Sequence, residues 1–257
     1  MGQNGHVSKL SSQPLSPLDG RYRSQVGDLG LYLSEAGLNR ARIQVEIEWL
    51  IWLVEKDLLG GGASLSEKEV AGLRAVYEDF SDSDVKALGE IEATTRHDVK
   101  AVEYFIRNKL EAMGRADLNE LVHFACTSED INNLAYALTI RDALEKVWLP
   151  SVRALVEKLR GLSQETAATP MLSRTHGQPA TPTTLGKELA VFVFRLQRQL
   201  SRIDGQAFLG KFSGATGTYA AHLVAAPDVD WPEQSKGFVE SLGLTHNPLT
   251  TQIESHD

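Results

Sequence analysis

Apolar side chains recur at spacings of three and four along residues 185–207, and this regularity limits the fold more than any other feature of the chain. Such spacing places the apolar residues on one face of a long α-helix. Thr181 before Pro182 predicts where this helix begins, because threonine is a capping residue and proline suits the first helical position. The residues of this stripe are Leu185, Leu189, Phe192, Leu196, Leu200, Ile203 and Ala207.

A second apolar stripe with helical spacing runs through residues 131–162. Pro150 lies inside it, so we expect a kinked helix rather than a clean break. A one-sided apolar stripe must be covered by another element, and long helices of this kind cover one another in helical bundles. The predicted fold class is therefore mainly α, with an N-terminal helical domain followed by part of a long-helix bundle.

Shorter segments indicate the helices of the N-terminal part. Residues 38–54 carry apolar side chains on more than one face, which indicates a helix packed on both sides. After a glycine-rich loop, Ser66 and Glu69 have the spacing of a capping box at the start of the next helix. The main strand pattern, over 210–222, predicts at most a small β-hairpin.

Three regions are expected along the chain. Residues 1–17 are polar and are predicted to be a disordered lead-in. A short polar stretch near 114–117 separates the N-terminal helical domain, 18–115, from the central bundle domain, 116–257. The closing sequence TTQIESHD resembles the entry to a further helix, so we expect the bundle domain within these residues to be incomplete.

Charge and cysteine content argue against several classes of function. The net charge of −8 disfavours nucleic-acid and membrane-surface partners, because both require a positive face. Cys126 is the single cysteine, which excludes an intrachain disulfide and fits a reducing cytoplasm. No apolar run is long enough for a membrane span. The histidines lack metal-site spacing, and phosphate-loop and dinucleotide motifs are missing, so we expect neither a metal nor a cofactor.

The segment TTRHDVKAVEYF predicts a helix start that can bind an anion. Thr95 and Asp98 have capping-box spacing, which would place Arg96 and His97 at the positive end of a helix. The alternative is that Asp98 only caps the helix and that His97 has no role in binding.

Two further segments carry groups suited to phosphates or carboxylates. In HFACTSEDINN, the spacing of Thr127 and Asp130 predicts another capped helix start, where Thr127 and Ser128 could hold a carboxylate. In PLDGRYR, Arg21 and Tyr22 follow a turn, and a guanidinium group matches phosphate or carboxylate geometry. The alternatives are a filled cap and a solvated surface turn.

The segment MLSRTHGQPATP, 171–182, cannot continue a helix, because Gly177, Pro179 and Pro182 interrupt it. It is predicted to be an ordered loop beside a helix start. His176 in this loop can exchange a proton near neutral pH. The alternative is a polar turn between two helices.

Together, and in this order, these segments closely resemble the adenylosuccinate lyases of the fumarase–aspartase–argininosuccinate lyase superfamily. The resemblance extends from about Leu18 to the last residue. DGRY combined with HDVKAVE favours this family over argininosuccinate lyases and fumarases. The segments that carry the resemblance are PLDGRY, TTRHDVKAVEYF, HFACTSEDINN, SRTHGQPATP and TTQIE.

The resemblance implies β-elimination of fumarate from adenylosuccinate to give AMP, and from SAICAR to give AICAR, in purine nucleotide biosynthesis. It implies a small-molecule substrate, no cofactor, and a cytoplasmic homotetramer whose active sites draw on several subunits. His176 corresponds to the general acid. The implied substrate-binding positions are Arg21, Tyr22, Arg96, His97, Asp98, Thr127, Ser128 and Gln252.

Three differences from the family pattern bear on these expectations. Arg96 stands where asparagine is expected, and Ser255 stands where proline is expected. The family's serine-rich loop ending in Met-Pro-x-Lys-x-Asn, which carries the expected base, does not occur within the 257 residues, so we expect this chain by itself to be inactive. The alternatives are a non-catalytic helical scaffold that retains ligand-binding positions, and a relative that acts on another succinylated or fumarate-releasing substrate.

Overall fold

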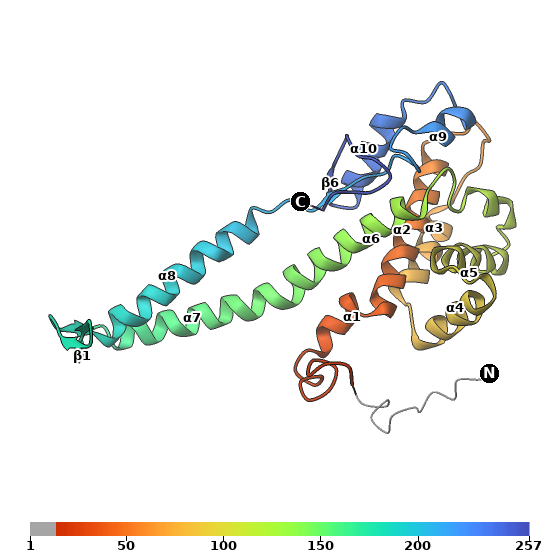
Figure 1. The fold of residues 1–257 in the computed structure, drawn as a ribbon. Helices are drawn as coiled ribbons and strands as arrows, with labels where there is room; N and C mark the ends of the chain where they lie inside the picture. The colour runs from red at the N-terminus through yellow and green to blue at the C-terminus, as the bar shows by residue number, and fades with distance from the viewer. Residues whose placement is uncertain (1–13, 257) are drawn as a thin grey trace, which may run out of the picture.

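The computed structural model describes residues 14–256, which form a helical body and a long two-helix arm (Figure 1). Most of the predicted lead-in, 1–13, lies outside the described residues. The mainly α fold that the sequence predicts is confirmed. The helices are α1 (Gly30–Leu33), α2 (Glu35–Glu55), α3 (Glu67–Glu78), α4 (Asp82–Thr95), α5 (Asp98–Ala112), α6 (Ser128–Ala143), α7 (Leu149–Glu165), α8 (Leu185–Asp204), α9 (Ala220–Ala225) and α10 (Trp231–Ser241).

Short 3-10 segments and strands connect these helices. The 3-10 segments are Gly27–Leu29 and Ala116–Leu121. The strands are β1 (Pro170–Met171), β2 (Arg174–Thr175), β3 (Gln178–Pro179), β4 (Thr183–Thr184), β5 (Leu209–Gly210) and β6 (Thr245–His246).

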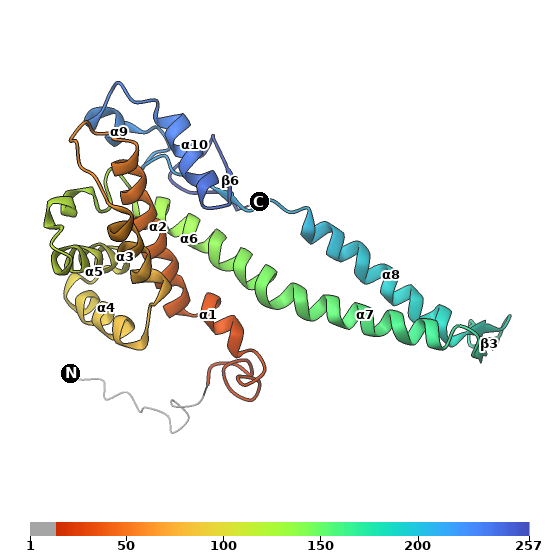
Figure 2. The ribbon, with the colours of Figure 1, turned by 180° about the vertical axis from the view of Figure 1, so that it is seen from behind.

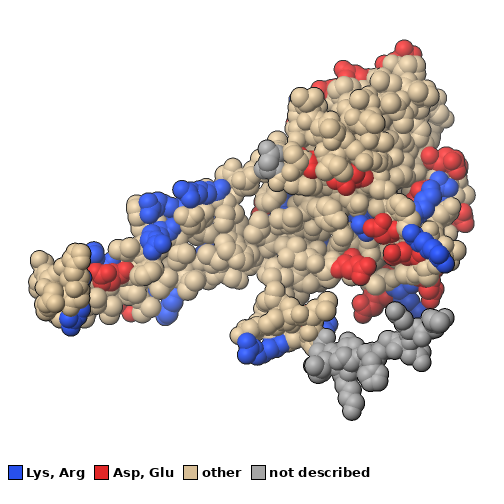
Figure 3. Space-filling model, viewed as in Figure 1, with Lys and Arg blue, Asp and Glu red and all other residues tan. Residues whose placement is uncertain are grey.

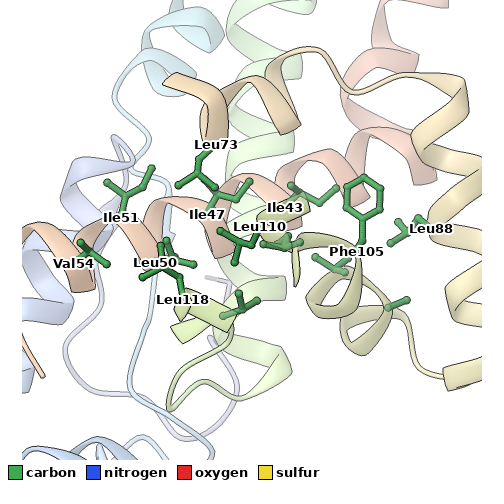
Figure 4. Packing of buried hydrophobic residues seen from close by; sticks show 14 residues of the cluster. Ile43, Ile47, Leu50, Ile51, Val54, Leu73, Leu88, Phe105, Leu110 and Leu118 are labelled. Atoms are coloured by element: carbon green, nitrogen blue, oxygen red, sulfur yellow. The ribbon is translucent and has the colours of Figure 1, made fainter. Parts of the chain in front are cut away.

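Helix α2 runs through the centre of the body and is buried on two sides. On one side Ile43, Ile47 and Leu50 pack against α3, α4 and α5 (Figure 4). On the other side Trp49 packs against Phe212, with 4.4 Å between the ring centroids, in a second core that includes α6 and α10. The two-sided packing predicted for this helix is confirmed.

Helices α6 and α7 form one long helix that leaves the body and becomes half of the arm (Figure 1). The helix continues past Pro150, as expected, and the irregularity is a π-helical turn at Leu144–Trp148. Proline lacks an N–H and crowds the carbonyl group four residues before it. A widened turn immediately before Pro150 relieves this crowding, because π-helical hydrogen bonds join residues five apart.

Helix α8 returns antiparallel to α7 and completes the arm; Figure 2 shows the pair from the other side. Their seam buries Leu149, Val156, Val193 and Leu200. The predicted start of α8 at Thr181–Pro182 is wrong. Thr183 and Thr184 pair with β1, so the backbone stays extended until Thr184, whose Oγ1 accepts a hydrogen bond from the Lys187 amide at 3.2 Å.

The hairpin predicted over 210–222 is also wrong. Strand β5 pairs in parallel with β6, and the Thr245 amide donates to the Phe208 carbonyl at 2.8 Å. The amides of Ser213 and Gly214 bond the carboxylate of Asp130 instead of a neighbouring strand. The antiparallel pairs of the described chain lie at the tip of the arm, where β1 pairs with β4 and β2 with β3.

The predicted domain boundary falls at the turn between α5 and the 3-10 segment Ala116–Leu121. Because Trp49 of the first region packs into the core of the second, the two regions share buried surface. The division into two domains stays a prediction. Within residues 14–256, no helix combines the length and apolar character needed to cross a membrane.

Candidate functional site

The start of α5 carries three of the predicted binding residues, but its cap differs from the prediction. Thr95 is the last residue of α4, and Arg96 follows in the left-handed conformation with φ 53°. His97 is therefore the capping residue of α5, and its Nδ1 accepts a hydrogen bond from the Lys100 amide at 3.2 Å. The capping box predicted for Thr95 and Asp98 is wrong, because a sharp reversal at Arg96 separates two helices there.

Arg42 of α2 joins this helix start to α6. Its guanidinium is buried and donates to Asp98 Oδ2 at 2.7 Å and to Asn132 Oδ1 at 2.8 Å. Burial alone would raise the pKa of the Asp98 carboxyl group, but the Val99 amide and the Arg42 charge outweigh it, and the pKa lies below its usual value. Asp98 is thus a fixed anion that aligns α5 with the first turns of α6.

The start of α6 has the predicted capping box, and the side chain of Gln252 contacts it at Thr127. The Thr127 amide donates to Asp130 Oδ2 at 2.9 Å, and the reciprocal bond completes the box. Gln252 Nε2 donates to Thr127 Oγ1 at 3.2 Å, although 125 positions separate the two residues. Thr127, Ser128 and Gln252 therefore lie together at the positive end of a helix, where carboxylates bind favourably.

His123, which the sequence analysis did not assign, lies four residues before Thr127. Its Nδ1 lies 2.6 Å from Oε1 of Glu46, and its amide donates to Glu46 Oε2 at 3.1 Å. Glu46 is fully buried on α2, and His123 has a positive φ of 60°. Burial lowers the pKa of the His123 imidazole, but the Glu46 carboxylate more than compensates and raises it overall. The sequence signal was Glu46 itself, an acid between apolar residues on a helix packed on both sides.

Arg21 and Tyr22 lie in an exposed turn that precedes α1 in the chain; the segment before α1 is at the lower edge of the body in Figure 1. The Arg21 guanidinium carbon sits 4.7 Å above the centre of the Tyr22 ring. Within residues 14–256, neither side chain has a hydrogen bond or ion pair to Thr127.

His176 lies at the tip of the arm, in the two-residue turn between β2 and β3. His176 and Gly177 both have positive φ, 50° and 76°, as a type I′ hairpin turn requires. The loop prediction is confirmed, and the imidazole is exposed. The helix from Ser128 to Glu165 rises 1.5 Å per residue, so His176 lies on the order of 55 Å from Thr127 in one chain.

The arm that carries His176 also differs from the body in charge. Residues 149–204 hold eight Lys or Arg against four Asp or Glu, a net charge of +4 in a chain of net −8. Basic side chains follow the arm in Figure 3, and acidic ones gather on the body. Within the described residues, no three His, Cys, Asp or Glu side chains are grouped as metal ligands would be.

The fold is shared with solved structures of lyases and lactonizing enzymes. A fumarate lyase from Mesorhizobium sp. BNC1 matches with a TM-score of 0.67 and 20% identity, over 88% of this chain and 49% of that chain. A 3-carboxy-cis,cis-muconate lactonizing enzyme from Pseudomonas putida matches with a TM-score of 0.65 and 24% identity, over 86% of this chain and 48% of that chain. At these identities the likeness shows the fold.

Sequence comparison identifies the family. The family model described as Lyase matches residues 20–257, so the chain belongs to this lyase family. It is 46% identical over 244 residues to the adenylosuccinate lyase of Haemophilus influenzae and 45% identical to that of Escherichia coli. Each match covers 95% of this chain and 54% of the relative. The chain thus spans about half the length of these relatives.

Proposed function

We propose that this protein acts as an adenylosuccinate lyase, which releases fumarate from adenylosuccinate to leave AMP and from SAICAR to leave AICAR. The observation that carries the proposal is the 46% identity to a curated adenylosuccinate lyase over 95% of the chain. The structure supports it, because Thr127, Ser128 and Gln252 meet at one helix start.

The proposed reaction accounts for the hydrogen-bond donors at the start of α6. A C–N bond breaks while a proton leaves the neighbouring carbon, so an acid is needed at nitrogen and a base at carbon. The succinyl group carries two carboxylates. The hydroxyls of Thr127 and Ser128, the Gln252 amide and the positive end of α6 offer donors for one of them.

The nucleotide part of the substrate requires cationic groups of its own. In the proposal, Arg21, Tyr22, Arg96, His97 and Asp98 hold the phosphate, ribose and base. Arg96 and His97 lie at the start of α5, where the helix dipole favours an anion.

We add His123 to the proposed binding groups. Glu46 orients its imidazole through Nδ1, which leaves Nε2 as the atom available to a ligand. Because Glu46 raises the pKa of His123, the ring favours its cationic form and suits an anionic substrate.

His176 acts in the proposal as the general acid that protonates the leaving nitrogen. A chain whose His176 lies on the order of 55 Å from its own Thr127 cannot use both in one site, so the imidazole must come from another copy of the chain. Phe192 and Phe194 on α8 are 54% and 63% exposed, and such apolar surface on the arm favours association. The positive charge of the arm favours an approach to an anionic substrate. We place the assembly, a homotetramer, in the cytoplasm.

The test is fumarate release from adenylosuccinate by the protein expressed from its complete reading frame. We expect His176→Ala to lower release by about 10²–10⁴-fold and Gln252→Ala to lower it strongly, and a mixture of the two variants, reassembled after mild dissociation, to recover part of it. Recovery follows because one copy supplies His176 and another supplies Gln252. A protein that binds adenylosuccinate and never cleaves it would instead support the scaffold alternative, and equal activity of the His176→Ala variant would refute the assignment of the acid.

A further inference from the structure

We propose that the buried ion pair of Asp130 and Lys211 is a positioning device that holds three segments of the substrate site in one geometry. The segments are the start of α6, the loop 213–219, and residues 250–252. The inference deepens the proposed function and rests on it for the nature of the ligand, a succinyl dicarboxylate. Neither residue is proposed to touch the substrate.

Asp130 lies in the first turn of α6 and is fully buried. Its Oδ2 accepts from the Thr127 amide at 2.9 Å and from the Gly214 amide at 3.1 Å. Its Oδ1 accepts from the Ser213 amide at 3.0 Å and from Lys211 Nζ at 2.7 Å. One carboxylate thus joins the helix start to a loop that is more than 80 residues away in the sequence.

Lys211 is equally buried and has hydrogen-bond partners at both its side chain and its backbone. Its Nζ donates to Asp130 Oδ1 and, at 3.1 Å, to the Gly214 carbonyl. Its backbone amide donates to Asn133 Oδ1 at 2.9 Å, and its carbonyl accepts from Asn133 Nδ2 at 3.0 Å. The lysine therefore holds the loop from both its side chain and its backbone.

The loop in turn supports Gln252, which closes a ring of contacts. Gly217 has φ +72°, and it packs so closely on the carbonyl groups of Thr250 and Thr251 that a side chain there would collide with them. Thr250 and Thr251 directly precede Gln252, whose Nε2 donates to Thr127 Oγ1. Contacts thus run from Thr127 through the ion pair, the loop and Thr250 back to Thr127.

A closed ring of this kind restricts geometry more than it adds stability. Replacing a buried ion pair by apolar residues is often neutral or stabilising, so stability alone does not explain it. A fully hydrogen-bonded buried network, by contrast, rigidifies the groups attached to it. Here those groups are Thr127 and Gln252, two of the predicted ligands of the succinyl carboxylate.

The test compares three variants of the 257-residue chain. Lys211→Met removes the cation and leaves a buried carboxylate without its counter-ion, so it can fail to fold. Asp130→Asn combined with Lys211→Met removes both charges while keeping size, and leaves no uncompensated charge. Val239→Ala is the matched control, because it truncates a fully buried residue of the same core without touching the ring.

Two NMR signals report on the ring without any ligand: the backbone amide of Gly214 and the side-chain amide of Gln252. In the double variant we expect Gly214 to exchange with solvent at least about tenfold faster relative to amides of α5, and the Gln252 signal to shift toward its position in an unfolded chain. Val239→Ala should change amide exchange across its whole core without singling out these two groups. A double variant with both signals unchanged would overturn the proposal.

A kinetic measurement separates positioning from folding in the protein expressed from its complete reading frame. For adenylosuccinate cleavage we expect the double variant to raise KM about tenfold with kcat within about threefold, and to leave the pH profile of kcat unaltered. Val239→Ala should leave KM unaltered, and an equal KM for the double variant would also overturn the proposal. Failure of the unsubstituted protein to cleave adenylosuccinate would refute the proposed function alone, and the NMR result would still decide whether the pair positions the ring.

Discussion

Replacing Glu46 by glutamine should destabilise the body in a way that depends on pH. Glutamine has the size of glutamate and keeps an acceptor for the His123 amide, but it removes the charge that stabilises the His123 imidazolium. Glu46 is fully buried, and 2.6 Å separates its Oε1 from His123 Nδ1. The substitution therefore changes one electrostatic contact and little of the packing.

The size of the effect follows from the contact. A hydrogen bond to a charged group contributes about 1.5–3 kcal/mol to the free energy of unfolding. In a chain of this length 1 kcal/mol corresponds to about 2–4 °C in Tm, so Glu46→Gln should lower Tm by roughly 3–12 °C at about pH 5.5.

The sign of the pH dependence follows from the raised pKa of His123. A group whose pKa is higher in the folded state stabilises the fold below its unfolded pKa, about 6.5, and this stabilisation is lost as pH rises through the folded-state pKa. The difference in Tm between the wild type and Glu46→Gln should therefore be largest at about pH 5.5 and shrink toward about pH 8.5.

The assay is thermal unfolding followed by circular dichroism across this pH range. Glu55→Gln on the exposed end of the same helix is the matched control and should leave Tm almost unchanged at every pH. A Glu46→Gln variant with the wild-type Tm at about pH 5.5, or with a deficit that does not vary with pH, would refute the reasoning.

Three further predictions concern other parts of the molecule. His176→Ala should lower kcat by about 10²–10⁴ with a modest change in KM, whereas Arg21→Ala should mainly raise KM; steady-state kinetics that reverse this pattern would contradict the assigned roles. Burial lowers the pKa of His222 to about 4. The free energy of unfolding should therefore fall by about 3 kcal/mol as pH drops from about 6.5 to 4. In His222→Phe, Tm measured over the same pH range should fall less steeply. Phe192→Glu should reduce the mass measured by light scattering, and an unchanged mass would show that this face does not mediate association.

Features set by neighbouring residues were predictable from the sequence. The apolar stripe of 185–207 predicts helix α8, because helical periodicity depends only on the chain itself. The capping boxes at Ser66 and Thr127 were predicted for the same reason, since each joins residues three apart. The resemblance of five short segments was enough to indicate the lyase family.

Two of the three local errors arose where a distant segment competes for the same backbone; the third, at Thr95, arose from the reversal at Arg96. Thr181 has the character of a helix cap, but pairing of β4 with β1 keeps the chain extended to Thr184. The glycine and threonine pattern of 210–222 suits a hairpin. In the structure, however, the loop amides donate to the Asp130 carboxylate, and β5 pairs with β6. Local propensity is worth tenths of a kcal/mol per residue, so one buried hydrogen bond to a charged group outweighs it.

The features of the candidate site also fall into two groups, those that the local sequence predicts and those that only the fold decides. The sequence alone indicated which short segments carry groups suited to binding an anion or transferring a proton, because those groups lie beside helix starts and turns that local signals reveal. Only the tertiary structure decided that Gln252 meets Thr127, that Glu46 orients His123, and that His176 lies at the far end of the arm. These contacts join residues 77 and 125 positions apart, and the strength of the Glu46–His123 contact also depends on burial, which excludes water from the pair. The spacing of neighbouring residues predicts neither which distant residue becomes the partner nor whether the contact is buried.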